Sequence, residues 1–292
     1  MDIEALRTFI AIHRSGTVTG AAAAVFRSQP AVSRRLALLE KELDVPLFER
    51  VPGGVVLSEA GRALLPFAEA VLASVRDAEA AVRAVRSQDS GPVTVALVGT
   101  LASTNLTSVL RRFAQRYPAV ELTLRTATSK EVSDLVRRAD VTVGLRYSAD
   151  PAPELECETL YSERLVIAAP PERAGTRIAT LSALAGERWL AFPERPGDAS
   201  SGSVRRVMDA AGVPESQILR IDSLTAQKRL VEAGFGIALV PDSSIQEELA
   251  AGSLVALEVG DLDVGLPVTL VTRRGGYLSA ATRTLLAELR RA

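Results

Sequence analysis

Apolar residues near the start of the chain recur at intervals of three and four, which is the repeat of an amphipathic helix. Ile3, Leu6 and Ile10 follow this spacing, and His13 continues it. The pattern therefore predicts a first helix that ends at the helix-stopping pair Ser15-Gly16. On this spacing His13 is expected to pack against a neighbouring helix rather than to act in catalysis.

Two further helices are predicted next. Small residues at 21–24 indicate a short helix that can approach a neighbour closely, and a leucine-rich repeat predicts a third helix over residues 28–43. Ser28 is placed to cap this third helix, and Pro30 lies in its first turn, where a missing N–H costs nothing. A supporting helix followed by two short helices joined by a tight turn is the outline of a helix-turn-helix unit.

A two-stranded wing and a long helix are predicted after this unit. Pro52-Gly53-Gly54 is a turn signal between two apolar runs, and Ser58 opens a helix that runs to about residue 88, interrupted only by Pro66. The apolar positions of this helix recur in steps of three and four: Leu64, Phe67, Val71, Val75, Ala78, Val82 and Val85. Such a seam suits a partner helix in a coiled coil, and the alternative is an ordinary core helix.

The rhythm changes after a short linker at 89–92, and strands then alternate with helices. Strands are predicted at 93–99, 119–127, 139–147, 165–170, 188–193, 217–223 and 236–241, with helices at 103–113, 129–138, 204–211 and 224–233. This alternation predicts an α/β fold with a largely parallel, doubly wound sheet in two subdomains. A ligand is expected in the crevice at the carboxyl ends of the strands.

The composition of the chain excludes several kinds of site and segment. The chain has 292 residues, a formal net charge of -1, one cysteine and one histidine. The net charge gives no global attraction to nucleic acid, so a DNA site must be local. One cysteine excludes an internal disulfide, and one histidine with one cysteine leaves no ligand cluster for structural zinc. Acidic residues stand where a signal peptide carries basic ones, and no run of about 18 apolar residues occurs, so a cytoplasmic protein without a membrane segment, metal or cofactor is expected.

Several motifs resemble those of LysR-type transcriptional regulators. In the DNA-binding part they are FIAIHRSGTVTGAAAA at 9–24, SQPAVSRRLALLEKELDVPLFER at 28–50 and VVLSEAG at 55–61. In the remainder, 111–124 and 230–241 look like two signature stretches of the family's effector-binding domain. The resemblance covers essentially the whole chain, strongly in the first third and more loosely beyond. Gly20 and Gly53 depart from it, because the family often has basic residues at these two positions.

The resemblance implies a domain organisation and a set of partners. A winged helix-turn-helix domain (1–58) is expected to lead through a dimerisation helix (59–90) to a periplasmic-binding-protein-like effector domain (91–292). Subdomain I would comprise about 91–163 and 267–292, and subdomain II about 164–266. The implied partners are double-stranded promoter DNA, a small-molecule effector, further copies in a homodimer or homotetramer, and RNA polymerase, with no membrane.

The predicted DNA contacts lie on the third helix and the wing, since in such regulators this helix enters the major groove. They are Gln29, which can bond adenine; Pro30, for a thymine methyl; Ser33, for base or phosphate; Arg34, for guanine or phosphate; and Arg35 and Arg50, for phosphate. The alternative is a merely solvated helix face. Residues 1–88 contain eleven basic and ten acidic side chains, a net charge of about +1. One copy is therefore expected to bind DNA weakly.

The predicted effector contacts follow the strands of the second part of the chain: Thr100, Ser103, Thr128, Ser129 and Arg146 in one subdomain, and Ser203 and Thr225 in the other. Hydroxyls and helix-start N–H groups can hold an anion, and arginine can pair with a carboxylate, so a small anionic metabolite is expected. Alternatively, Ser103 and Ser129 cap helices, and Arg146 pairs with Asp150 or Glu154.

The chain is thus predicted to be an effector-controlled, sequence-specific regulator and not an enzyme. The competing hypothesis is a small-molecule-binding protein or enzyme whose N-terminal helices only oligomerise it. Residues 28–50 separate the two, because a pure binding module has no need to display them.

Overall fold

The structure is a computed structural model that describes residues 1–86, 92–194 and 199–291. The chain divides into two compact units, one formed by Met1–Val85 with Arg137–Asp140 and the other by Arg86–Val136 with Val141–Ala292. Of the predicted linker, residues 89–91 lie outside the described residues. No helix in the described ranges is long and apolar enough to cross a membrane.

The first unit consists of short helices, a hairpin and a long helix: α1 (Ile3–Ser15), α2 (Val18–Ala24), α3 (Gln29–Leu43), β1 (Phe48–Val51), β2 (Gly54–Leu57) and α4 (Glu59–Arg86). This confirms the predicted helix-turn-helix, wing and long helix, and α4 continues through Pro66. The Thr17 side chain caps α2 by accepting a hydrogen bond from the Gly20 N–H. Ser28 occupies the N-cap position of α3, but its side chain accepts no bond from the helix, so the predicted capping by Ser28 is wrong.

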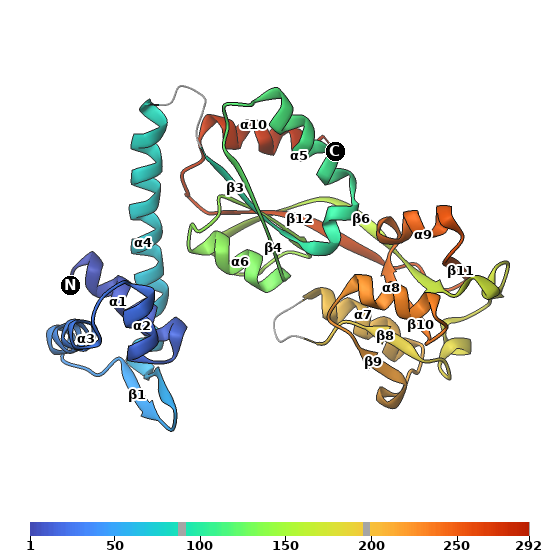
Figure 1. Cartoon of the computed structure of the whole chain (residues 1–292), viewed down its shortest axis with the longest axis horizontal. Coiled ribbons are helices and arrows are strands. Elements are labelled where there is room, and N and C mark those ends of the chain that lie inside the picture. The colour runs from blue at the N-terminus through green and yellow to red at the C-terminus, as the bar shows by residue number, and fades with distance from the viewer. Residues whose placement is uncertain (87–91, 195–198, 292) are drawn as a thin grey trace. The chain divides into compact units, whose positions relative to one another are not determined.

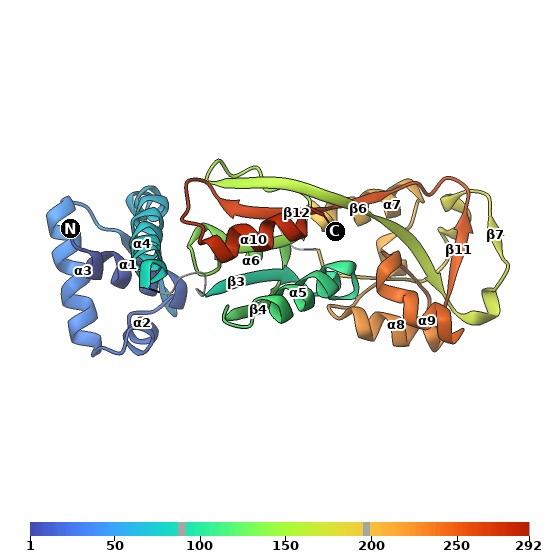
Figure 2. The same ribbon diagram turned by 90° about the horizontal axis from the view of Figure 1, so that it is seen from above.

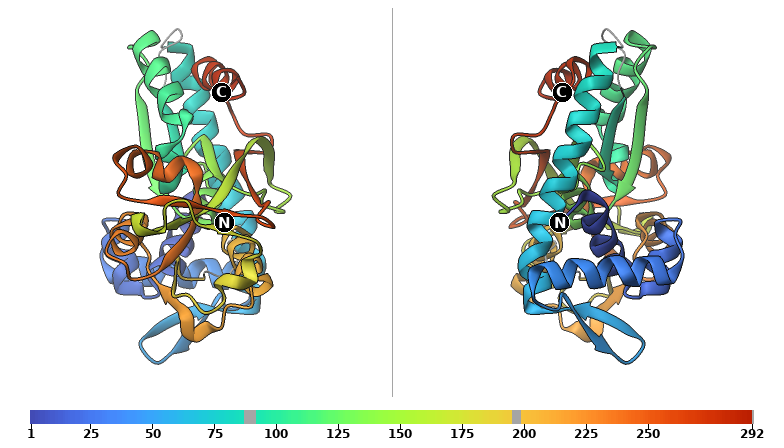
Figure 3. Two further views of the ribbon diagram at one scale, coloured as in Figure 1. Left: turned by 90° about the vertical axis from the view of Figure 1, so that its right-hand side faces the viewer. Right: turned by 90° about the vertical axis from the view of Figure 1, so that its left-hand side faces the viewer.

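The core of the first unit lies between α1, α3, the wing and the first half of α4 (Figure 3). Phe9 and Leu39 are fully buried there, and the Phe9 ring lies 5.4 Å from that of Phe48, centroid to centroid. His13 is exposed, so the prediction that it packs is wrong. The buried face of α1 turns instead towards Ile12, which packs against α2.

Two glycines hold the wing close to the helices. The Val55 N–H donates to the Gly16 carbonyl oxygen at 2.8 Å, and a Cβ on Gly54 would lie 2.3 Å from the same oxygen. A Cβ on Gly61 would lie 2.1 Å from the Leu47 carbonyl oxygen. These approaches leave no room for a side chain, so both positions require glycine.

The second unit alternates strands and helices, as predicted. Its strands are β3 (Val93–Val98), β4 (Leu122–Ala127), β5 (Val143–Tyr147), β6 (Leu155–Ala169), β7 (Arg177–Ile178), β8 (Trp189–Ala191), β9 (Ile218–Arg220), β10 (Ile237–Pro241), β11 (Val255–Val259) and β12 (Gly265–Arg273). Its α-helices are α5 (Asn105–Arg116), α6 (Ser129–Arg137), α7 (Ala199–Ala210), α8 (Leu224–Glu232), α9 (Gln246–Ala251) and α10 (Ala280–Leu289). Its short 3-10 helices are η1 (Gly99–Ser103), η2 (Pro171–Arg173), η3 (Leu181–Leu184), η4 (Glu215–Gln217) and η5 (Asp242–Ile245).

The sheet of the second unit runs in the order β4-β3-β5-β12-β6-β10-β8-β9, with β11 also paired to β6. The strands β3, β4 and β5 are parallel, as are β8, β9 and β10. Between these sets β12 and β6 run antiparallel to their neighbours. The sheet is therefore mixed, with parallel strands on both sides, and the prediction of a largely parallel sheet is only partly correct.

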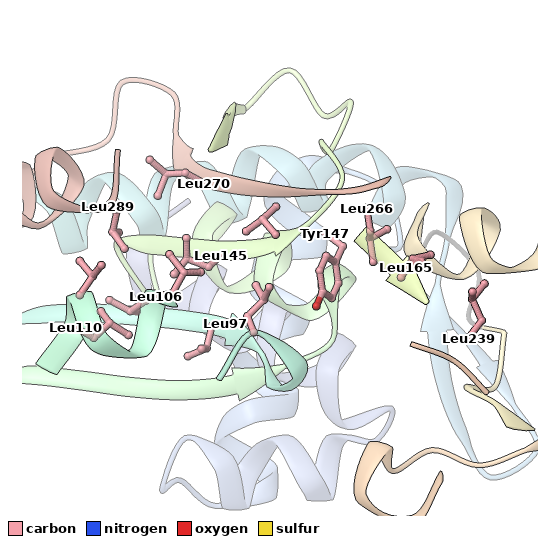
Figure 4. Packing of buried hydrophobic residues seen from close by; sticks show 14 of the residues in the cluster. Leu97, Leu106, Leu110, Leu145, Tyr147, Leu165, Leu239, Leu266, Leu270 and Leu289 are labelled. Carbon is pink, nitrogen blue, oxygen red and sulfur yellow. The ribbon is translucent and has the colours of Figure 1, made fainter. Parts of the chain in front are cut away.

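The long strand β6 joins the two halves of this unit (Figures 1 and 2). It pairs with β12 as far as Arg164 and with β10 from Leu165 onwards. Helices α5 and α10 cover one face of the first half, and α6 covers the other (Figure 1). Leucines from β3, β5, β12 and the covering helices α5 and α10 fill the core between them, with Tyr147 at its edge (Figure 4).

Candidate DNA-binding surface and effector site

Helix α3 has one anchored face and one free face. Val32 and Leu39 are 2% and 1% exposed and fix the helix to the rest of the first unit. Gln29, Ser33 and Arg34 lie on the exposed side. Among the described residues no hydrogen bond or ion pair uses these three side chains, so their donors and acceptors are open to a partner. Pro30 is also exposed, in the first turn.

Arg35 has a partner within the protein. Its Nη1 lies 3.4 Å from Glu4 Oε2 on α1, and both side chains are partly exposed. This ion pair steers the guanidinium towards α1, so Arg35 shares its charge between the fold and any phosphate. Arg50, by contrast, is exposed on β1 of the wing, opposite Val55. The turn beside it contains Gly53 at φ +88°, a conformation that favours glycine over the basic residue common in the family.

Helix α4 carries an apolar stripe that nothing in the described chain covers. Phe67, Val71 and Val82 are 71%, 41% and 66% exposed, and Ala78 is exposed between them. We call these four residues the α4 stripe. Leu64, predicted to belong to the same seam, packs instead in the core of the first unit, and the side chain of Val85 lies outside the described residues.

The carboxyl ends of β3 and β5 hold a hydrogen-bonded chain of polar side chains. Thr100 Oγ1 donates to Tyr147 Oη at 2.9 Å, and Tyr147 Oη donates to Glu163 Oε2 at 3.1 Å. Burial and then the nearby Glu163 carboxylate raise the pKa of Tyr147, so its hydroxyl stays protonated and a donor. Glu163 is buried within β6, just before the point at which this strand changes its partner from β12 to β10.

The helix starts predicted to bind an anion are occupied by the protein itself. Thr104, not Ser103, caps α5, and Ser103 is exposed. At α6 the Thr128 N–H and hydroxyl both donate to Glu131 Oε2, at 2.8 and 2.9 Å, and the Glu131 N–H donates back to Thr128 Oγ1. This reciprocal capping box places a carboxylate where an anion would have to sit. Ser129 is 1% exposed, and within the described chain its hydroxyl has no hydrogen-bond partner.

Arg146 is buried and forms an ion pair with Asp150, so it is not a free cation. It is 2% exposed; its Nη1 lies 2.6 Å from Asp150 Oδ2 and donates to Ser133 Oγ, and its Nε donates to the Tyr147 carbonyl oxygen. Burial raises the pKa of Asp150, but hydrogen bonds from Ser133 and Ala152 and the Arg146 charge outweigh burial and lower it. The alternative that Arg146 pairs with Asp150 is therefore confirmed. Its predicted contact with an effector carboxylate, and the anionic nature of the effector, stay predictions.

The two effector contacts predicted in the other half of the second unit, Ser203 and Thr225, differ in exposure. Ser203 in α7 is 9% exposed and accepts a hydrogen bond from Arg206 Nη2 at 3.0 Å. Thr225 is exposed in the first turn of α8, which Ser223 caps. Tyr147 and Glu163 are not among the residues predicted from the sequence. Tyr147 ends a predicted strand and could have been found there, whereas Glu163 lies in a stretch that was not predicted as strand.

A winged helix-turn-helix with an open polar face, followed by a bilobal α/β unit, defines a DNA-binding protein with a ligand-binding domain. Two family models match the chain: "Bacterial regulatory helix-turn-helix protein, lysR family" over residues 3–62 and "LysR substrate binding domain" over residues 86–292. The chain therefore belongs to the LysR family of transcriptional regulators. This result sets aside the hypothesis that the N-terminal helices serve oligomerisation alone.

Known relatives cover nearly the whole chain. The regulator TfdS of Cupriavidus pinatubonensis is 30% identical over 277 residues, which is 92% of each chain. The regulator CbbR of Xanthobacter flavus is 30% identical over 282 residues, or 95% of this chain and 84% of that one. The structure of full-length CbnR in complex with its target DNA matches with a TM-score of 0.63 at 25% identity, covering 100% of this chain and 99% of that one. Both relatives are named as transcriptional regulators.

Proposed function

We propose that α3 reads the sequence of a target promoter, and that a small molecule bound in the second unit controls the use of that promoter. The observation that carries the first part is the open row Gln29, Ser33 and Arg34 on a helix whose other face is anchored. Glutamine suits adenine and arginine suits guanine in the major groove. Pro30 adds an apolar contact, and Arg50 and Arg35 add phosphate contacts that set the register without reading bases.

The effector is proposed to lie at the carboxyl ends of the strands of the second unit. Ser129 supports this place, because a buried hydroxyl without a partner is ordinarily completed by a ligand or a water. Thr100, Ser103, Ser203 and Thr225 are retained as further contacts. Thr128 contributes through its capping box, which fixes the start of α6.

The remaining organisation is part of the same proposal. The proposed domains are 1–58, 59–90 and 91–292, the last divided at about 163 and 267. The change of partner of β6 at Arg164–Leu165 supports the division at about 163. The α4 stripe supports a homodimer, and pairing of the second units would complete a homotetramer. The regulator is proposed to act by binding DNA and effector, without catalysing a reaction. Its proposed location is the cytoplasm, where promoter DNA lies, and its further partner at the promoter is RNA polymerase.

In vitro selection tests the assigned reading helix. Full-length protein is incubated with random duplexes, and the bound sequences are amplified and sequenced. The wild type is expected to enrich a motif, while Gln29→Ala and Arg34→Ala lose preference at separate positions within it. Lys41→Ala, which removes a cation at the far end of α3, serves as the matched control and is expected to keep the motif. An unchanged motif in both Gln29→Ala and Arg34→Ala would contradict the proposed roles.

A thermal-shift screen tests the effector site. The full chain is heated with a panel of small carboxylates, amines and neutral polar compounds. A compound that stabilises the wild type is expected to lose most of this effect in Ser129→Ala and Thr100→Val, and to keep it in Ser182→Ala, whose hydroxyl lies in η3 and pairs with Thr180. Equal stabilisation of all variants would place the compound elsewhere.

A further inference from the structure

The turn between α2 and α3 exposes an aromatic side chain. Phe26 is 93% exposed, the highest value among the large apolar residues of the described chain. The preceding Val25 is half-buried and packs against the core, so the turn itself is anchored. A fully solvated phenyl ring contributes nothing to folding by burial, and its presence needs another reason.

The backbone at Phe26 is also unfavourable for this side chain. The Phe26 N–H donates to the Ala23 carbonyl oxygen at 3.2 Å, and the Arg27 N–H donates to that of Ala22 at 3.0 Å. This pair of bonds is the Schellman motif, whose left-handed position is usually filled by glycine. Phe26 occupies it at φ +54°, where its Cβ crowds the backbone. The fold would be better served by glycine, so the ring is retained at a cost to stability.

The position of Phe26 points to its partner. It stands two residues before Ser28, the N-cap of α3, and the exposed Gln29 and Pro30 follow directly. The ring is therefore continuous with the surface proposed to face the major groove. The groove offers one apolar group to such a ring, the C5-methyl of thymine, which phenylalanine can contact. We propose that Phe26 is a specificity-determining DNA contact that recognises a thymine methyl beside the bases read by α3. This inference rests on the proposed function of α3.

Replacement of thymine by uracil removes the methyl alone and tests the contact. In the duplex selected by the wild-type protein, each dT is replaced in turn by dU, and full-length wild type and Phe26→Gly are titrated by fluorescence anisotropy. At the thymine that Phe26 contacts, the wild type is expected to lose about three- to fivefold in affinity, the size expected for one buried methyl. Phe26→Gly is expected to bind the selected duplex more weakly and to show no loss at that position. A loss at a thymine that Pro30 contacts is expected to remain in Phe26→Gly.

Thermal unfolding supplies a second readout. Phe26→Gly is expected to melt at a higher temperature than the wild type because glycine suits the left-handed turn. A purely structural role for the ring would instead lower both melting temperature and affinity. Asp44→Asn serves as the control, since Asp44 is the other non-glycine residue at φ +54° near α3, and it is expected to leave the uracil profile unchanged.

The outcomes separate this inference from the function on which it rests. A wild type that enriches no motif overturns both. A wild type that enriches a motif, with a Phe26→Gly profile identical to its own, overturns only the role of Phe26. If Phe26→Gly alters the mass of the oligomer and leaves DNA binding intact, the ring belongs to a contact between copies and the inference is wrong.

Discussion

At the residue scale, Arg146 was predicted to bind a ligand, but its charge is used within the fold in an ion pair. Its guanidinium is fully buried and neutralised by Asp150, four residues later. Removal of one partner from a buried pair leaves an uncompensated charge, so Asp150→Asn is expected to lower the free energy of unfolding of the second unit by about 3 kcal/mol. Urea denaturation followed by circular dichroism measures this loss. Glu258→Gln breaks the exposed pair with Arg177 and is expected to cost less than about 1 kcal/mol. Equal losses in the two variants would contradict this account of Arg146.

The same pair predicts a dependence of stability on pH. The pKa of Asp150 is lowered in the folded protein, so the unfolded chain binds its proton more readily. The stabilisation is therefore fully present above the unfolded pKa of about 4 and is lost as the pH falls through the lower, folded value. Denaturation at pH 6 and at successively lower pH values is expected to show the gap between wild type and Asp150→Asn narrowing with acidity. A gap that is constant down to the acid limit would contradict the assignment.

Gly61 predicts a second effect at the residue scale. Because a Cβ there would lie 2.1 Å from the Leu47 carbonyl oxygen, Gly61→Ala is expected to force the start of α4 away from the wing and to destabilise the first unit by about 2 kcal/mol. Gly186→Ala, where nothing lies within 4 Å of the added carbon, is the matched control and is expected to be nearly neutral. Thermal unfolding compares the two variants. Similar melting temperatures would show that the close approach is not required.

At the scale of elements, α4 predicts self-association. The α4 stripe exposes Phe67, Val71 and Val82 along one side of a single helix. Burial of these side chains by a second copy would give about 1.5 to 3 kcal/mol for each, so Phe67→Glu is expected to weaken the dimer by at least about tenfold. Sedimentation equilibrium measures the dissociation constant. Arg83→Glu places the same side chain on α4 outside the stripe and is expected to leave association nearly unchanged. An unaffected Phe67→Glu dimer would assign the interface to another surface.

Elements with a strong local pattern could be predicted from the sequence. The recognition helix combines a leucine repeat with a proline in its first turn, and β10 and the last five residues of β6 are short, continuous apolar runs. By contrast, the first half of β6 alternates and is largely exposed, so its apolar content is too low to mark it as strand. It forms a strand because β12, far along the chain, supplies its hydrogen bonds.

Of the candidate site residues, those on α3 could be predicted from the sequence, because their availability depends only on which face of the helix is exposed. Gln29, Ser33 and Arg34 are free because the apolar positions of α3 point the other way, which periodicity reveals. The effector residues depend on long-range partners instead. The ion pair of Arg146 with Asp150 was an open alternative in the sequence, but its burial beneath α6 depends on tertiary packing. The capping box of Thr128 and Glu131 was readable from their spacing of three and was overlooked.

At the scale of the whole molecule, the near balance of charge shapes how this regulator holds DNA. Eleven basic and ten acidic side chains in the first 88 residues give little non-specific attraction. Affinity must then come from base contacts and from two copies acting together, rather than from a dense basic surface. Binding of the selected duplex is accordingly expected to weaken only modestly between 50 and 200 mM salt, compared with the roughly 10³- to 10⁵-fold loss of proteins that make many phosphate contacts. Anisotropy titrations over this range measure the slope, and a loss of the larger size would show that phosphate contacts dominate.

The most direct test of sequence reading by α3 is the ratio of affinities for the selected duplex and a scrambled one of equal length and composition. Anisotropy gives this ratio at one salt concentration for the full-length wild type, Gln29→Ala and Arg34→Ala. A large ratio is expected for the wild type and a fall of about tenfold in each variant, with binding to the scrambled duplex nearly unchanged in Gln29→Ala. A ratio that survives both substitutions would show that the sequence is read by some other part of the protein.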